Sequence, residues 1–384
     1  MYNRFTYRFV IPVLFLVTGT IGLSGCIDEL EEVKSKGERK LVVYGRITTD
    51  PPPYEVKITE SAPYIGGVNG IQKVGGATVV LHSESGESEV MRQTKPGVYR
   101  SDTLGMRGQL GESYFITVEL IDGSTYHSEP ETIAGKAEIN ELTFEFDTRQ
   151  QYSEEGVLIN EDGFTLRASF DDGPERDRYL LNWNKTYKVI THPERRGIRA
   201  PWDITRIIPD PPRCSGWVRD FTVFQIRYIP FDECTCCECY ITEFGETFGL
   251  VNDRLIQGNT ISSELGFIPV GSEFVDKVYV QASLVQLSYR SYQYWFKIQQ
   301  QLQNSGTLFD SPPGRIPGNI YADDPEGSEV LGYFMAVGSS SAVKGIDPLD
   351  IPYAFNPREY IEGIVAEDCR IATGGTNIKP AFWE

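Results

Sequence analysis

Short segments in which apolar and polar residues alternate follow one another through the first third of the chain. Side chains of a β-strand point to opposite faces in turn, so this period of two predicts half-buried strands. Turn residues separate the segments, among them Asp122-Gly123, a strong hairpin signal. The predicted strands are Leu41–Ile47, Tyr54–Ile58, Ala77–Leu81, Gly97–Arg100, Tyr114–Leu120 and Thr125–His127. Strands this short at this spacing predict a β-sandwich over residues 39–135.

The chain without its first 25 residues has about 358 residues, more than one hydrophobic core usually serves, so we expect two domains. A second strand-rich region follows. Its predicted strands are Glu141–Phe146, Phe164–Phe170, Tyr179–Ile190, Phe221–Ile229 and Lys277–Leu287. Predicted loops are the Pro/Gly-rich stretches 192–213, 310–319 and 323–327, together with Gly338–Ser341. We therefore expect a mainly β protein. An Ig-like or carboxypeptidase-regulatory-like sandwich would be followed by a β-rich domain over residues 136–384.

One amphipathic helix is predicted in this second domain, over Ser291–Asn304. Ser305-Gly306 would end it, because glycine readily adopts the conformation that closes a helix. Its large apolar residues recur at helical spacing and are Tyr292, Trp295, Phe296 and Leu302. Such a stripe predicts packing against the core rather than a platform for a ligand.

The first 26 residues have the three-part layout of a secretory signal peptide. Arg4 and Arg8 precede an apolar run, Phe9–Val17, which is too short to span a bilayer. The ending, Leu23-Ser24-Gly25-Cys26, resembles a bacterial lipobox, in which the cysteine is acylated and the peptide is cut before it. The sequence thus predicts a signal peptide over 1–25 and lipid attachment at Cys26. The alternative is an ordinary signal peptide with a chance cysteine.

The chain is acidic, with a formal charge of −18. Cleavage before Cys26 removes two arginines and no acid, which gives −20. A charge of this size argues against direct binding to nucleic acid or to anionic lipid. Residues 26–38 predict an acidic tether, and Ile27–Glu32 resembles the surface-export signal of Bacteroidetes lipoproteins. We expect an outer-membrane location with surface display, and the periplasmic face is the alternative.

Six cysteines remain beyond Cys26, and four of them lie within DECTCCECY, residues 232–240. They are Cys214, Cys234, Cys236, Cys237, Cys239 and Cys369. In an oxidising compartment six cysteines predict disulfides, with 15 possible pairings. Bonds from the cluster to Cys214 and Cys369 are easier than a bond between adjacent cysteines, and a remaining pair would close within 234–239.

An extended conformation would place Cys234 and Cys236 on one face of this segment and Cys237 and Cys239 on the other. A metal site is the weaker alternative, because C-x-C-C-x-C is too compressed to wrap one tetrahedral ion. Partly free thiols are a further alternative. We expect no metal and no cofactor.

Catalytic motifs are lacking in the sequence. His82, His127 and His192 each stand alone, outside any H-E-x-x-H or H-x-H pair. There is no G-x-S-x-G elbow, no P-loop and no dinucleotide fingerprint. Asp171–Gly173 and Asp323-Asp324 lack the spacing of a calcium loop and indicate solvated turns. Acidic residues are plentiful, so a glycosidase pair stays open, since spatial separation defines it.

Several stretches in this order resemble a Bacteroidetes lipoprotein family, domain of unknown function 4249. They are LVVYGRITTDPPPYEVKITESAPY (41–64), GATVVLHSESGE (76–87), GVYRSD (97–102), GESYFITVELIDGSTYHSE (111–129), VQASLVQLSYRSYQYWFKIQQQLQNSGTLFDSPPGRIPGNI (280–320), LGYF (331–334) and DCRIATGGTNIKPAFW (368–383). The resemblance implies partnership with a TonB-dependent receptor of the starch-utilisation type. It supplies no catalytic residues, and the cysteine cluster is denser than the family pattern.

We therefore expect a lipid-anchored, non-enzymatic accessory protein of the outer membrane. It would partner a TonB-dependent receptor in ligand capture or uptake. Loops on the β scaffold would form its contact surface. The alternatives are an envelope glycan hydrolase with paired carboxylates and a structural or adhesive surface lipoprotein.

Overall fold

A computed structural model describes residues 39–61, 71–153, 156–174, 177–221, 226–252, 258–303, 314–324, 329–357 and 365–384. The predicted signal peptide, the predicted lipid-attachment residue Cys26 and the predicted tether 26–38 lie outside these residues. The chain divides into two compact units, one of residues 1–39 with 61–72 and one of residues 40–60 with 73–384. Nearly all described residues belong to the second unit, which contains every element discussed below except the start of β3.

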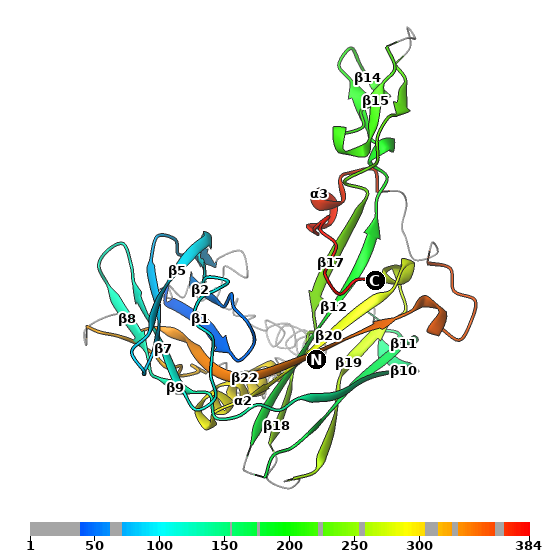
Figure 1. Cartoon of the computed structure of the whole chain (residues 1–384). Coiled ribbons are helices and arrows are strands. Elements are labelled where there is room, and N and C mark those ends of the chain that lie inside the picture. The colour runs from blue at the N-terminus through cyan, green and yellow to red at the C-terminus, as the bar shows by residue number, and fades with distance from the viewer. Residues whose placement is uncertain are drawn as a thin grey trace, which may run out of the picture. The chain divides into compact units, whose positions relative to one another are not determined.

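The N-terminal strands form the predicted sandwich (Figure 1). They are β1 (Leu41–Thr48), β2 (Glu55–Glu60), β3 (Gln72–Lys73), β4 (Thr78–Ser83), β5 (Ser88–Lys95), β6 (Val98–Arg100), β7 (Ser113–Glu119), β8 (Thr125–Ser128) and β9 (Glu131–Thr132). Val43 and Ile58 on one side meet Leu81 and Ile116 on the other in a single core. All six predicted strands are present. β5 escaped prediction because Met91 is its one fully buried residue.

The C-terminal strands form a second core between two sheets. One sheet contains β10 (Ile139–Tyr152), β11 (Leu158–Asp171) and β19 (Thr260–Pro269) in antiparallel order. The other contains β12 (Arg178–Ile190), β17 (Glu238–Phe244), β18 (Gly249–Asn252), β20 (Val278–Gln286) and β22 (Leu331–Ile346). Phe164 and Phe170 from the first sheet pack with Leu181 and Leu284 from the second. The expected second β-rich region is thus present; β10 and β11 are longer than predicted, whereas β12 and β20 agree with their predicted bounds to within a residue at each end.

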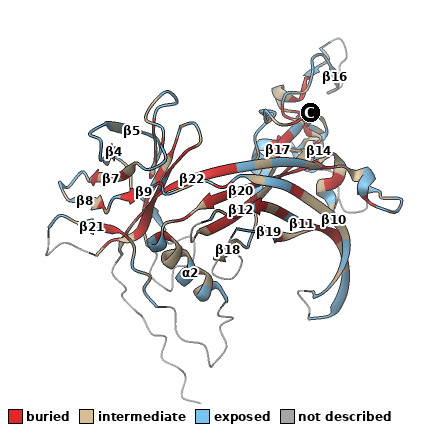
Figure 2. Ribbon diagram, turned by 60° about the horizontal axis from the view of Figure 1, so that its bottom comes forward, coloured by how far each residue is buried: buried red, intermediate tan, exposed pale blue. Residues whose placement is uncertain are grey.

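β22 belongs to both regions. Residues 331–337 pair in parallel with β1, and residues 338–346 pair antiparallel with β20. A further C-terminal strand, β21 (Ile320–Ala322), pairs with β8. One continuous sheet therefore runs from β12 through β20 and β22 to β1 and β2, and Figure 2 shows the buried middle of β22 within it. The boundary at residue 135 stays a prediction, because strands from beyond it complete the first sheet.

Gly338–Ser341 was expected as a loop and is instead part of β22. Small residues are required there because the chain before β10 crosses closely: a Cβ on Gly338 would lie 1.9 Å from the Gly135 carbonyl oxygen. Ser339 donates to Asp50 Oδ2 at 2.6 Å, and Ser340 Oγ accepts from the Ile139 amide at 3.2 Å. Close crossing and hydrogen bonds outweigh the low strand propensity of glycine and serine.

The predicted helix is α2 (Tyr289–Gln303). Tyr292 and Trp295 pack against Tyr333 and Met335, as the stripe predicted, and Tyr294 joins them. Phe296 and Leu302 were also expected to face the core but are exposed. The helix packs on the face of the continuous sheet with one side only, so it buries a narrower stripe than the sequence pattern suggested.

Two further predictions between β12 and β17 are wrong. The expected loop 192–213 contains a hairpin of β13 (Gly197–Ala200) and β14 (Asp203–Pro209). The expected strand Phe221–Ile229 is replaced by a second hairpin of β15 (Trp217–Arg219) and β16 (Tyr228–Pro230), and residues 222–225 lie outside the described part. Neither hairpin joins a larger sheet, so neither shows the alternating burial on which strand prediction depends.

The remaining elements are short. They are η3 (Pro193–Arg195), η4 (Arg213–Ser215), η5 (Ser272–Val275), η6 (Pro348–Asp350) and α3 (Cys369–Thr373). Residues 314–319 and 323–324 carry no helix or strand, as predicted, and the rest of those two predicted loops is outside the described residues. Among the described residues, no helix combines the length and apolarity that a bilayer crossing requires.

Candidate functional site

A hollow of about 550 Å³ lies on one face of the continuous sheet. Alternate residues of a strand share a face, so three strands of this sheet each contribute residues two apart, with β22 between two of them. These are Tyr44, Arg46 and Thr48 of β1, Asn182 and Asn184 of β12, and Gln281 and Ser283 of β20. The opposite face of β1 buries Val43 and Ile47 in the sandwich core. The same alternation that builds the core therefore presents polar side chains to this hollow.

Four of these polar side chains form two cross-strand pairs. Asn182 lies opposite Ser283, and Asn184 lies opposite Gln281. All four are half-buried, and none of them makes a side-chain hydrogen bond within the described part of the chain. An amide side chain offers both donors and an acceptor. The floor of the hollow therefore carries a set of hydrogen-bonding groups that the protein itself does not use.

Charged residues at the rim nearly balance. Glu55 accepts from Arg100 at 2.9 Å and pairs with Lys57 at 3.2 Å. Burial opposes its ionisation, but hydrogen bonds from both cations lower the pKa of Glu55 overall. Asp50 accepts from Ser339, whereas Arg46 forms no ion pair with a described residue. The hollow thus carries one cation, Arg46, without an ion-pair partner among the described residues, beside two carboxylates that already accept hydrogen bonds.

A second hollow, of about 660 Å³, shares Trp183, Phe244 and Gly245 with the first. Phe244 is 79% exposed and stands where the two hollows meet. The Trp183 ring lies between two glycines, since a Cβ on Gly245 or Gly266 would overlap it at 2.3 and 2.6 Å. Trp183 Nε1 is buried and has no acceptor among the described residues. Because side chains alternate along β12, Trp183 and Lys185 point away from the face of Asn182 and Asn184, so the second hollow opens on the other face of this strand. We call the first hollow the groove.

Carboxylates line the second hollow, which bears on the hydrolase alternative. Glu264 pairs with Arg149 at 3.0 Å, and Glu243 pairs with Lys185 at 3.3 Å. A general acid needs a carboxyl group whose pKa is raised. Burial raises the pKa of Glu131, but that residue lines neither hollow and is bonded within the core.

The six cysteines form three disulfides: Cys214–Cys236, Cys234–Cys237 and Cys239–Cys369. Two bonds leave the cluster and one closes within it, as the spacing argument expected. The expected extended conformation is wrong, because residues 235–237 form bends that bring Cys234 and Cys237 together. The pairing therefore depends on a local fold of the backbone that alternation does not describe.

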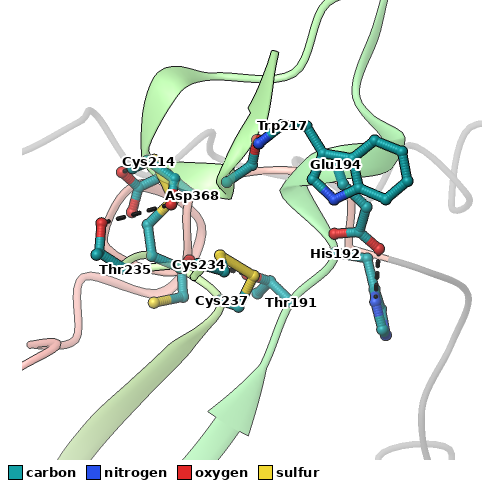
Figure 3. The surroundings of a disulfide bond; sticks show 12 residues. Thr191, His192, Glu194, Cys214, Trp217, Cys234, Thr235, Cys237 and Asp368 are labelled. Carbon is teal, nitrogen blue, oxygen red and sulfur yellow. Dashed lines mark hydrogen bonds and ion pairs between the residues drawn. A yellow bond between two sulfur atoms is a disulfide. The ribbon is translucent and has the colours of Figure 1, made fainter. Parts of the chain in front are cut away.

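Cys214, Cys236 and Asp368 offer ligand atoms within 4.8 Å of one another, the geometry of a possible metal site. Figure 3 shows Asp368 beside Cys214, with Oδ2 3.7 Å from Sγ. Both sulfurs belong to one disulfide, so neither is a thiolate. The hydrogen bond from Arg370 outweighs burial and lowers the pKa of Asp368. The carboxylate is thus occupied as a helix cap and ion pair.

The three histidines occupy separate places. His82 stacks on Phe115, and burial lowers the pKa of its imidazole. His127 pairs with Asp323, and His192 lies 3.1 Å from Glu194. In the predicted turn at residues 171–173, Asp171 accepts from the Thr260 hydroxyl and Asp172 from the Tyr179 hydroxyl. Both carboxylates thus accept hydrogen bonds from protein hydroxyl groups, as carboxylates in ordinary turns do.

No residue of the groove was predicted as a site residue. Its signal in the sequence is the polar pair Asn182 and Asn184 inside the otherwise apolar run of β12, matched by Gln281 and Ser283 in β20. That signal carries meaning only once the two strands are known to be neighbours.

Fold and groove together define a mainly β, disulfide-bonded protein with an open hollow lined by polar and aromatic residues. The model of the domain of unknown function DUF4249 matches residues 27–342, and the chain belongs to this family. No curated protein matches the chain.

Proposed function

We propose that this chain is a non-enzymatic binding protein of the cell envelope that captures a small polar ligand in the groove. The observation that carries the proposal is the set of four unused polar side chains on β12 and β20. Pockets that recognise small molecules combine apolar and aromatic walls with a few convergent polar groups. Tyr44, Trp183 and Phe244 supply the aromatic part here.

The chemistry of the lining favours a ligand that is neutral or weakly anionic and rich in hydroxyl or amide groups. Amides and hydroxyls at the floor both donate and accept hydrogen bonds. Arg46 adds one cation without an ion-pair partner among the described residues. A strongly cationic ligand would meet no free carboxylate at the floor of the first hollow, since Asp50 and Glu55 are bonded there.

The envelope location is part of the proposal. Three disulfides are typical of a chain that matures in an oxidising compartment. The lipobox-like sequence ending at Cys26 supports lipid anchoring, and the acidic tether supports display on the surface of a Bacteroidetes outer membrane. Resemblance to the lipoprotein family supports a TonB-dependent receptor as partner, to which the captured ligand would pass.

The first test is a mild-detergent purification of the lipidated protein from native outer membranes, with and without crosslinking. We expect a near-stoichiometric TonB-dependent receptor to co-purify. Recovery of the lipoprotein alone after crosslinking would contradict the partnership and favour an adhesive or structural role.

A groove variant then separates capture from docking. Asn182→Ala with Gln281→Ala should leave the receptor complex intact but reduce growth on the ligand that the receptor imports. Gln109→Ala with Gln300→Ala removes two exposed amides elsewhere and is the matched control. Unchanged growth of the groove variant would refute the binding role. Hydrolysis of envelope glycan by the purified protein, lost in Glu264→Gln, would establish the hydrolase alternative instead.

A further inference from the structure

A pair of small hairpins lies between the end of β12 and the start of β17. β13–β14 and β15–β16 each pair only within themselves in the described structure, and Figure 1 shows β14 and β15 beyond the ends of β12 and β17. We call residues 195–221 and 226–231 the cationic arm. An isolated two-stranded hairpin is marginally stable in water. The arm therefore needs support at its base and cover for its apolar side chains.

Disulfides supply the support. Cys214–Cys236 joins the arm to the segment that leads into β17, and Cys234–Cys237 tightens that segment. Backbone hydrogen bonds add to this, from the Phe231 amide to the Gly216 carbonyl at 2.8 Å and from Thr235 to Cys214 at 2.8 Å. The base of the arm is thus fixed by covalent bonds even though no sheet extends into it.

The apolar side chains of the arm lack cover. Trp202 and Ile204 are 66% and 72% exposed, and Ile207 is 73% exposed. Phe221 and Phe231 are 84% and 78% exposed. Five large apolar side chains this exposed within one short segment are unusual for a free surface. They indicate a surface where the arm contacts a membrane or another molecule.

Charge on the arm has the opposite sign to that of the whole chain. Residues 195–230 contain seven arginines and three aspartates, and no lysine or glutamate, within a chain of formal charge −18. Arg196 pairs with Asp210 and Glu367. Arg199 and Arg206 are exposed and form no ion pair with a described residue, as is also true of Arg213 and Arg227. The repulsion from anionic surfaces that the net charge predicts does not apply locally.

Register shows that apolar groups emerge on both faces of the first hairpin. Ile198 lies opposite Ile208, whereas the next pair, Arg199 and Ile207, points to the other face. A flat surface of a folded partner would cover only one face of the hairpin. A hairpin that enters a lipid interface with its turn first is surrounded by that interface, which accepts apolar groups together with aromatic rings and arginines at headgroup level.

We propose that the cationic arm docks on the surface of an anionic phospholipid bilayer. Arg199 and Arg206 bind lipid phosphates, while Trp202 and Ile204 enter the boundary between headgroups and acyl chains. The arm then gives the protein a second membrane contact and fixes its orientation. This proposal stands independently of the groove, because none of the arm residues lines either hollow.

The test compares variants of residues 27–384, which lack both the predicted signal peptide and Cys26, so that neither an apolar leader nor an acyl chain contributes. Each is purified with its disulfides intact and sedimented with phosphatidylcholine vesicles, with and without phosphatidylglycerol. Arg199→Gln with Arg206→Gln should weaken binding to the anionic vesicles about tenfold or more. Arg92→Gln with Lys95→Gln removes the same charge from exposed positions of β5 and should leave binding unchanged.

Depth is measured by tryptophan quenching with brominated phosphatidylglycerol. The wild-type sequence should lose fluorescence on binding, and Trp202→Phe should remove most of that loss. Leu104→Ser, at a residue that is 94% exposed on the sandwich, is the apolar control. Equal binding to neutral and anionic vesicles, equal losses in arm and control variants, or no quenching of Trp202 would each overturn the proposal. Dimers that arm substitutions dissociate, without vesicle binding, would assign the arm to a second copy instead.

Discussion

A buried carboxyl group, Glu131 of β9, connects three elements at the residue scale. It is 3% exposed and accepts from the Tyr333 hydroxyl of β22 and the Ser288 hydroxyl before α2, each at 2.6 Å. Burial raises the pKa of Glu131 above its ordinary value of 4.5, although both hydrogen bonds favour the charged form. The folded state therefore binds this proton more tightly than the unfolded state.

Glu131→Gln should change the pH dependence of stability. A raised folded pKa means that wild-type stability is fully present below pH 4.5 and falls as pH rises toward the folded pKa. The neutral amide does not titrate, so the free energy of unfolding of the variant should rise relative to that of the wild type by up to about 1.4 kcal/mol per pH unit in that window. Urea unfolding between pH 4 and 8 measures it. A constant difference at all pH values, or the same trend in the exposed Glu119→Gln, would contradict the argument.

A close backbone approach makes a second prediction at this scale. Gly332 has φ +104°, and a Cβ there would lie 1.9 Å from the Val43 carbonyl oxygen. Gly86 has nearly the same φ, +101°, with nothing within 4 Å. Gly86→Ala should cost about 1–2 kcal/mol of backbone strain, and Gly332→Ala at least about 3 kcal/mol. Equal losses on urea unfolding would show that the β1–β22 contact tolerates a methyl group.

At the scale of elements, the disulfides differ in how much of the chain they close. Cys239–Cys369 spans 130 residues and holds α3 against β17, whereas Cys234–Cys237 spans three. Constraint of the unfolded chain grows with loop length. Paired replacement of Cys239 and Cys369 by alanine should cost about 5 kcal/mol, and the Cys234 and Cys237 pair about 2 kcal/mol.

Denaturant unfolding of the two paired variants measures this difference, with thiol counting as the control. Wild-type protein denatured without reductant should yield no alkylatable thiol among the six cysteines. Similar destabilisation by both pairs would contradict the loop-length account, and free thiols in the wild type would contradict the pairing itself.

Over the whole molecule, β22 makes the two sheet regions one structure. It hydrogen-bonds β1 along its first half and β20 along its second. If one region unfolds, β22 loses the strand that pairs with one of its halves, and the other region is destabilised. We therefore expect both regions to unfold in a single transition. All five tryptophans lie at or beyond Trp183, so their fluorescence reports mainly the C-terminal region, although Trp295 also packs edge-on against Tyr44 of β1. Urea curves from tryptophan fluorescence and far-UV circular dichroism should coincide. A second dichroism transition without a fluorescence change would show independent domains.

Local pattern determined much of this protein from sequence alone. Alternation of apolar residues located most strands from β1 to β12, and β20, because burial of one face is a property of each segment by itself; β3, β5 and β9 were missed. Helical spacing located α2, but the predicted buried stripe was too wide, since Phe296 and Leu302 face solvent. The cysteine spacing indicated two bonds outward and one inward.

Tertiary structure decided what depends on contact between distant segments. Gly338–Ser341 is a strand because it pairs with β20, and its residues are small because Gly135 crosses there. The arm hairpins carry no core of their own to mark them. The groove exists because pairing of β12 with β20 sets Asn182 beside Ser283 and Asn184 beside Gln281. Neighbouring strands far apart in the chain leave no local signal, so sequence could supply the polar residues but not their meeting place.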